Sequence, residues 1–134
     1  MTIVIPDLLL GQKKSGGASF LSIRQTVDLN LDNLIKNIKK TRTLDGKIDL
    51  NLKFIKTVKE LRVQNPTQLP GDEIYMDMIV GSLEEFPDAG HFKLDSCDDY
   101  KKKIVSQYDP RSGGKTKSPA LNHAIDVLNS ICAK

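Results

Sequence analysis

The four residues Asp28-Leu29-Asn30-Leu31 recur 21 positions later as Asp49-Leu50-Asn51-Leu52, and each copy continues into a lysine-rich amphipathic stretch. Around both copies, apolar residues return at spacings of three and four, which places them on one side of a helix. The two apolar faces consist of Val27, Leu31, Leu34, Ile35 and Ile38, and of Leu50, Phe54, Ile55, Val58 and Leu61. The pattern predicts an antiparallel pair of helices over about residues 27–42 and 49–63, joined by a turn at residues 44–47. Asp28 or Asn30 is the expected N-cap of the first helix.

A β-hairpin is the competing interpretation of this stretch. Apolar and polar residues alternate over residues 27–31 and 48–54, and Asp45-Gly46 between them is a hairpin signal. The alternation fails at Leu34-Ile35 whereas the helical face continues, so helices are favoured over an α+β fold with a hairpin around Asp45-Gly46. The repeated phrase is either a duplicated helix or a chance echo, since a solenoid needs at least about three copies.

Three further helices are expected in the second half of the chain. Two prolines and a glycine within residues 64–71 end the second helix, and a third is predicted near residues 72–86. Its expected apolar face consists of Ile74, Met78, Ile79 and Leu83. A fourth helix is predicted near residues 98–108, and a fifth near 118–132, where Ser118-Pro119 supplies an N-cap and a first-turn proline. The expected apolar face of the fifth helix consists of Leu121, Ile125, Leu128 and Ile131.

The expected fold is therefore all-α: a single compact domain of about five helices over residues 20–134, preceded by a flexible N-terminal arm, residues 1–19. A chain of 134 residues can build one core but not two. Aromatic residues make up 5% with no Trp, so the core must be aliphatic, which suits packed helices better than a β-sandwich. In the arm, Leu8, Leu9 and Leu10 are expected to lie on the domain core or to contact a partner.

Charge is strongly segregated along the chain. Residues 1–64 hold 12 Lys and Arg against 6 Asp and Glu, residues 65–100 hold 1 against 9, and residues 101–134 hold 7 against 2. The order is basic, acidic, basic. This distribution, more than the net charge of +3, is the electrostatic property that a function has to explain.

Cysteine content and hydropathy predict the compartment. Cys97 and Cys132 are too few for a disulfide framework, and the start of the chain lacks the basic leader of a secretion signal. We therefore expect two reduced, partly buried and inert thiols in an intracellular protein, cytoplasmic or nuclear. No apolar run approaches the roughly 20 residues that a membrane span needs, so no membrane contact is expected.

No motif predicts catalysis, a metal site or a cofactor. Ser112-Gly113-Gly114-Lys115-Thr116 ends like a phosphate-binding P-loop, but the required glycine five positions before Gly114 is Asp109. His91 and His123, with the two cysteines, lack the close spacing of zinc ligands. Neighbouring carboxylates are explained as charges at helix N-termini. We therefore expect that the protein is not an enzyme and has no small-molecule substrate.

Lysine-rich helix faces carry the functional hypothesis, which is nucleic-acid binding without strong sequence preference. The candidate residues are Lys36, Lys39, Lys40, Arg42, Lys53, Lys56, Lys59, Lys101, Lys102, Lys103, Arg111, Lys115 and Lys117. If the cations before and after the acidic block converge in space, they form a single nucleic-acid footprint. The alternative is a protein-protein adaptor, an inhibitor or a self-assembling subunit, in which the acidic block docks on basic faces of the same chain or of a second copy.

Overall fold

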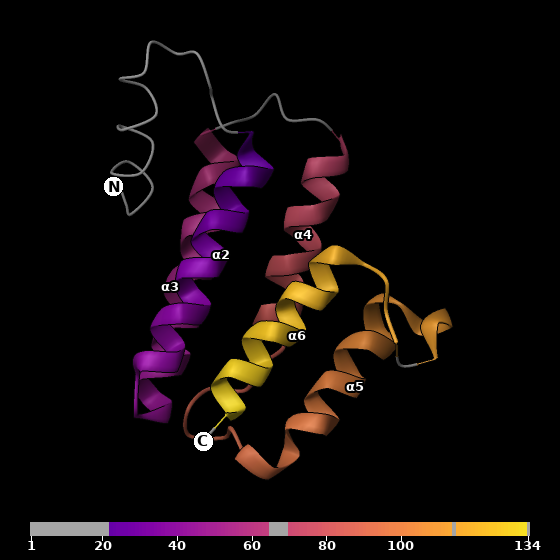
Figure 1. Ribbon diagram of the computed structural model, residues 1–134. Helices are drawn as coiled ribbons and strands as arrows, with labels where there is room; N and C mark the ends of the chain where they lie inside the picture. Colours follow the sequence, from indigo (N-terminus) through magenta and orange to yellow (C-terminus); the bar gives the residue numbers. More distant parts are fainter. Residues whose placement is uncertain (1–21, 65–69, 114, 134) are drawn as a thin grey trace.

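The computed structural model describes residues 22–64, 70–113 and 115–133. Every secondary-structure element in these ranges is helical (Figure 1). The α-helices are α2 (Ile23–Lys40), α3 (Leu44–Gln64), α4 (Pro70–Glu84), α5 (Cys97–Tyr108) and α6 (Pro119–Cys132), with short 3-10 helices η1 (Leu94–Ser96) before α5 and η2 (Pro110–Ser112) after it. The all-α prediction is confirmed. The N-terminal arm, with Leu8, Leu9 and Leu10, lies outside the described residues.

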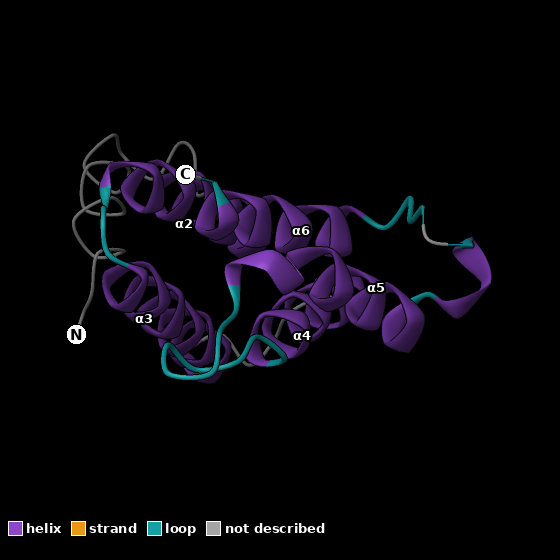
Figure 2. Cartoon of the chain, turned by 90° about the horizontal axis from the view of Figure 1, so that it is seen from below, coloured by secondary structure: helices purple, strands orange, loops and turns teal. Residues whose placement is uncertain are grey.

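Four helices, α2, α3, α4 and α6, surround one apolar core, and α5 packs against the outside of α6 and α4. Figure 2 shows α3 beside α2 and α4, with α6 closing the bundle between α4 and α2. The turn between α2 and α3, the end of α6 and the start of α5 lie at the same end of the molecule (Figure 1). This end is where the segments that form the candidate site meet.

The antiparallel pair of helices is confirmed, but the predicted turn at residues 44–47 is wrong. The chain turns at residues 41–43, and Asp45-Gly46 lie in the first turn of α3, which leaves no hairpin there. The Thr43 hydroxyl accepts a hydrogen bond from the Gly46 amide at 3.1 Å, so the helix starts before its hydrophobic pattern does. Gly46 permits this tight turn, because a Cβ there would lie 2.7 Å from Thr41 Cγ2.

Serine residues cap the N-termini of the first and the last helix that the structure describes. Ser22 caps α2 in a capping box: its hydroxyl accepts from the Gln25 amide at 3.1 Å, and the Gln25 side chain accepts from the Ser22 amide at 2.9 Å. The predicted caps Asp28 and Asn30 are wrong, because both lie inside the helix. Ser118 caps α6 and Pro119 follows in its first turn, as predicted.

The predicted apolar faces of α2, α3 and α6 are buried or partly buried, but that of α4 is partly wrong. Ile74 is 62% exposed, whereas its neighbours Tyr75 and Met76 are buried. Tyr75 lies inside because its hydroxyl donates a hydrogen bond to Asp28 on α2 and the Arg24 guanidinium lies 4.0 Å above its ring. Burial, with the hydrogen bond to Asp28, raises the pKa of Tyr75.

The two copies of the repeated phrase take different environments. Asn30 and Asn51 are both buried, and the Asn30 amide donates to the Thr26 carbonyl at 2.8 Å. The Asn51 amide donates to the Leu83 carbonyl on α4 at 3.5 Å, and its Oδ1 has no hydrogen-bond partner among the described residues. Leu52 is 55% exposed although the matching leucine of the first copy is buried. Identical residues in the two copies therefore do not have identical roles in packing.

Candidate functional site

The acidic block forms ion pairs within the chain. α4 lies beside α3 and also contacts α5, and its carboxylates meet cations from both. The Lys59 ammonium lies 2.7 Å from Glu84, and the Lys103 ammonium lies 3.5 Å from Glu85, which follows α4. Arg62 pairs with Asp77 and with Glu73. These exposed pairs stabilise the fold by at most about 1 kcal/mol each. They also show that some of the lysines that the sequence offers as candidates are paired with carboxylates of the same chain.

Two more candidate cations pair within their own helix. Lys53 lies 3.1 Å from Asp49 on α3, and Lys102 lies 3.3 Å from Asp98 on α5. With the pairs above, four of the candidate cations, Lys53, Lys59, Lys102 and Lys103, have carboxylate partners. Each is a weaker candidate for binding a phosphate than a lysine without such a partner.

Four candidate cations without a carboxylate partner gather at the turn between α2 and α3. Lys36, Lys39 and Lys40 lie on the side of α2 opposite its buried residues, and all three are exposed, as is Arg42 in the turn. In the part of the chain that the structure describes, none of these four forms an ion pair. We define the basic end as these four residues and Lys47. Over residues 36–47 Asp45 is the only carboxylate.

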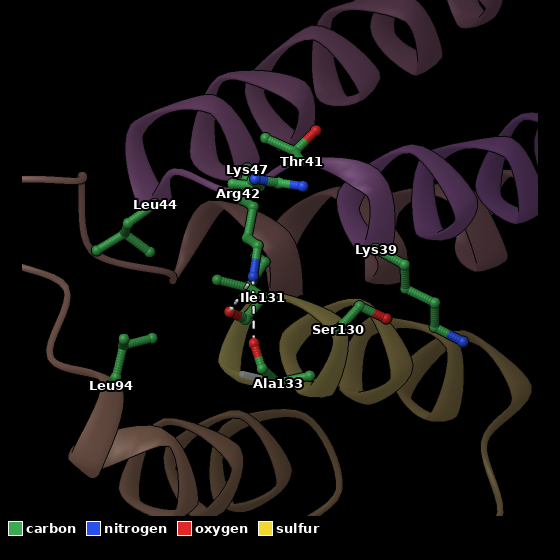
Figure 3. A pocket seen from close by; sticks show the side chains of 9 residues that line it. All are labelled: Lys39, Thr41, Arg42, Leu44, Lys47, Leu94, Ser130, Ile131 and Ala133. Atoms are coloured by element: carbon green, nitrogen blue, oxygen red, sulfur yellow. Dashed lines mark hydrogen bonds between the residues drawn. The ribbon is translucent and has the colours of Figure 1, made fainter.

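A pocket of about 510 Å³ opens at the basic end (Figure 3). Its lining residues are Lys39, Thr41, Arg42, Leu44, Lys47, Leu94, Ser130, Ile131 and Ala133, none of them a carboxylate. Lys47 reaches across the pocket to the end of α6, where its ammonium donates to the carbonyls of Ile131 at 3.4 Å and Ala133 at 3.2 Å. This contact satisfies carbonyls that a helix end leaves open.

The expectation of two reduced thiols is wrong, because Cys97 and Cys132 form a disulfide. The bond joins the start of α5 to the end of α6, with 6.5 Å between the two Cα atoms. Ile131 and Ala133, on either side of Cys132, both line the pocket, and Leu94 stands three residues before Cys97. The disulfide therefore ties together two walls of the pocket.

The second group of candidate cations lies elsewhere. Lys101 is on α5, and Arg111, Lys115 and Lys117 belong to the segment between α5 and α6. In both views this segment lies on the opposite side of the molecule from the turn between α2 and α3 (Figures 1 and 2). Lys56, the remaining candidate, is exposed on α3 about 18 Å along the helix from its first residue. The structure therefore does not bring Arg111, Lys115 and Lys117 into one surface with the cations at the turn between α2 and α3.

Other groups that could carry chemistry are dispersed. His91 is exposed in a loop and pairs with Asp88 at 2.7 Å, and this contact lowers the pKa of Asp88. His123 lies edge-on to the Tyr75 ring, with the ring centroids 6.3 Å apart. Within residues 22–64, 70–113 and 115–133, no three His, Cys, Asp or Glu side chains are grouped as metal ligands, and no helix is long and apolar enough to cross a membrane.

Sequence reasoning missed most of the pocket. The sequence predicts a turn at Lys47, and Leu94, Ser130 and Ala133 give no sign of a site, because they meet only when α5 and α6 pack together. The chain matches no protein-family model, no curated protein and no solved structure. Any functional assignment therefore has to come from the charges and the shape of the basic end.

Proposed function

We propose that the protein is a non-enzymatic helical binding protein that binds nucleic acid through the basic end, without strong sequence preference. The observation that carries the proposal is the concentration there of exposed cations that have no carboxylate partner among the described residues, beside a pocket whose described lining residues include no carboxylate. Phosphate oxygens supply the missing negative charge. Lysine dominates the group, and lysine binds phosphate as a point charge rather than reading base edges.

The salt dependence follows from the number of cations. If Lys36, Lys39, Lys40 and Arg42 each neutralise one phosphate of a single strand, the logarithm of the association constant falls with the logarithm of salt concentration with a slope of about −3. Raising the salt concentration from 50 to 200 mM then weakens binding about 50-fold. Lys47 is left out of this count because the carbonyls at the end of α6 already hold its ammonium.

A charge-reversal pair of variants tests the proposal. In the first variant Lys36, Lys39 and Lys40 become Glu. In the control Arg111, Lys115 and Lys117 become Glu, which makes the same change in net charge on another part of the surface. Binding of labelled DNA and RNA is measured by fluorescence anisotropy at rising salt, with helix content checked by circular dichroism.

We expect the first variant to lose most of its affinity and most of the salt slope, and the control to lose much less. Equal losses in the two variants would mean that net charge, not the basic end, drives binding. Absence of binding by the unaltered chain at low salt would reject nucleic acid as the ligand.

Association with protein is the second candidate function, and exposed apolar residues on α3 support it. Leu52 is 55% exposed and Val63 is 80% exposed, and their spacing of eleven residues places both on the outer side of the helix. Light scattering distinguishes a second copy of the chain from a foreign partner. Self-association is supported if the unaltered chain is a dimer and the double variant Leu52→Glu with Val63→Glu is a monomer, and a strictly monomeric unaltered chain counts against it.

An intracellular setting belongs to the nucleic-acid proposal, because nucleic acid is available there. The disulfide is the feature that argues against this setting, since disulfides persist mainly in oxidising compartments. Thiol labelling in intact cells, before lysis, distinguishes the two settings.

A further inference from the structure

We infer that the pocket at the basic end receives an unpaired nucleobase, so that the nucleic acid bound there is single-stranded. This inference rests on the proposed function and names its ligand class. The cations alone would bind a duplex and a single strand alike. The pocket is the feature that separates them, because its walls are suited to a base rather than to a phosphate.

Part of the wall is aliphatic. Leu44 and Leu94 come from separate segments of the chain, line the same pocket and lie on one side of it in Figure 3. Leu94 is 46% exposed. Its partial exposure leaves apolar surface that a flat, weakly hydrated base would cover, whereas a phosphate would gain nothing from it. A cavity of about 510 Å³ lies within the range of small-ligand sites.

The polar groups in the pocket can satisfy the edge of a base. The Thr41 hydroxyl donates its proton to the Asn37 carbonyl at 2.7 Å, and the Ser130 hydroxyl donates to the Asp126 carbonyl at 2.8 Å. Both oxygens therefore keep lone pairs that can accept from an amino group of a base. The Lys47 ammonium carries three protons, of which two are directed to carbonyls. Because donor and acceptors are both present, every base finds a partner, which agrees with weak sequence preference.

A single strand reaches this pocket more easily than a duplex does. Bases in a duplex are stacked and paired, and taking one out costs a few kcal/mol, whereas the bases of a single strand are already accessible. Lys39 and Arg42 stand at the pocket, with Lys36 and Lys40 on the adjacent surface of α2, so the backbone of an inserted base meets cations. The planar Arg42 guanidinium can also stack on the base.

The test compares three probes that carry the same number of phosphates: a single-stranded oligonucleotide, the same strand with abasic sites, and a hairpin duplex. The unaltered chain should bind the single strand about tenfold tighter than the abasic strand or the duplex. Ala133→Leu places a larger side chain in the pocket without changing charge, at an exposed position that costs the fold little. Asn122→Leu adds a leucine to an exposed position of α6 outside the pocket lining and serves as the control.

The inference holds if Ala133→Leu lowers the affinity for the single strand to that for the abasic strand while Asn122→Leu leaves it unchanged. Equal binding of all three probes by the unaltered chain would overturn base insertion and leave the proposed function standing. Failure to bind any probe at low salt would overturn both, so the two failures are distinguishable.

Discussion

Removing the disulfide should destabilise the domain more than any exposed ion pair can. The perturbation is the double substitution Cys97→Ser with Cys132→Ser, which leaves the packing of α5 on α6 in place. The bond closes a loop with a sequence separation of 35 residues. The chain-entropy relation for a loop of this length gives about 4 kcal/mol at 25 °C. A typical domain has a free energy of unfolding of about 5–15 kcal/mol, so the loss removes a large part of it.

Urea denaturation followed by circular dichroism measures the effect. With a slope of about 2 kcal/mol per molar urea, the midpoint should fall by about 2 M in the double serine variant. For the unaltered chain, a dithiol reductant should lower the urea midpoint by a similar amount, because the reductant converts the disulfide to two thiols and is itself oxidised. The double variant should not respond to the reductant, which makes it the internal control.

Two results would refute this reasoning. Titration of the denatured, unreduced chain should find no free thiol, and two thiols per chain would mean that Cys97 and Cys132 are not joined. A change in the free energy of unfolding below about 1 kcal/mol would mean that the packing of α5 and α6 already holds the two chain segments together without the bond.

Three further predictions concern packing and titration. Asn51→Leu should raise the free energy of unfolding by about 1 kcal/mol, because it removes a buried oxygen that has no partner among the described residues. Asn30→Leu should lower it by about 1 kcal/mol, because it removes a well-made hydrogen bond, and urea titrations in which both variants shift the free energy in the same direction would contradict this. Gly81→Ala should lower the free energy of unfolding, because its Cβ would lie 2.5 Å from the Tyr108 hydroxyl oxygen. In a Tyr108→Phe background the same substitution should raise the free energy of unfolding by up to about 1 kcal/mol, and an equal effect in both backgrounds would exclude the clash. Because the folded state raises the pKa of Tyr75 above its unfolded value near 10, the stability it contributes is complete below about pH 10 and is lost as pH rises further, so Tyr75→Phe should flatten the fall in stability measured above pH 10.

The sequence predicted those parts of the fold that depend on local spacing. The buried faces of α2, α3 and α6 follow from a repeat of 3.6 residues, which each helix carries by itself. Ser118 and Pro119 mark the start of α6 because a cap needs only its own first turn. The start of α3 was missed since its cap, Thr43, precedes the hydrophobic pattern and so gave no periodic signal.

The rotation of α4 could not be predicted from α4 alone. Ile74 is more apolar than Tyr75, and a hydrophobic pattern therefore turns Ile74 inward. The structure buries Tyr75 because Asp28, 47 positions away, accepts a hydrogen bond from its hydroxyl and Arg24 covers its ring. Both partners belong to α2, so the favourable orientation exists only after the two helices have packed. The pairing of Cys97 with Cys132 is non-local in the same sense.

The candidate site required a further step that the sequence could not supply, which is deciding which cations the fold itself neutralises. Lys39 and Lys59 look equivalent in sequence, since both stand on the polar side of a lysine-rich helix. They differ because α4 packs beside α3 and brings Glu84 within 2.7 Å of Lys59, while no carboxylate of the described residues forms an ion pair with Lys39. A binding surface for a polyanion is the positive charge that remains after such internal pairing. This criterion removes Lys53, Lys59, Lys102 and Lys103 from the candidates. Among the cations that remain, those of the basic end also border a pocket, so their reversal should remove most of the binding.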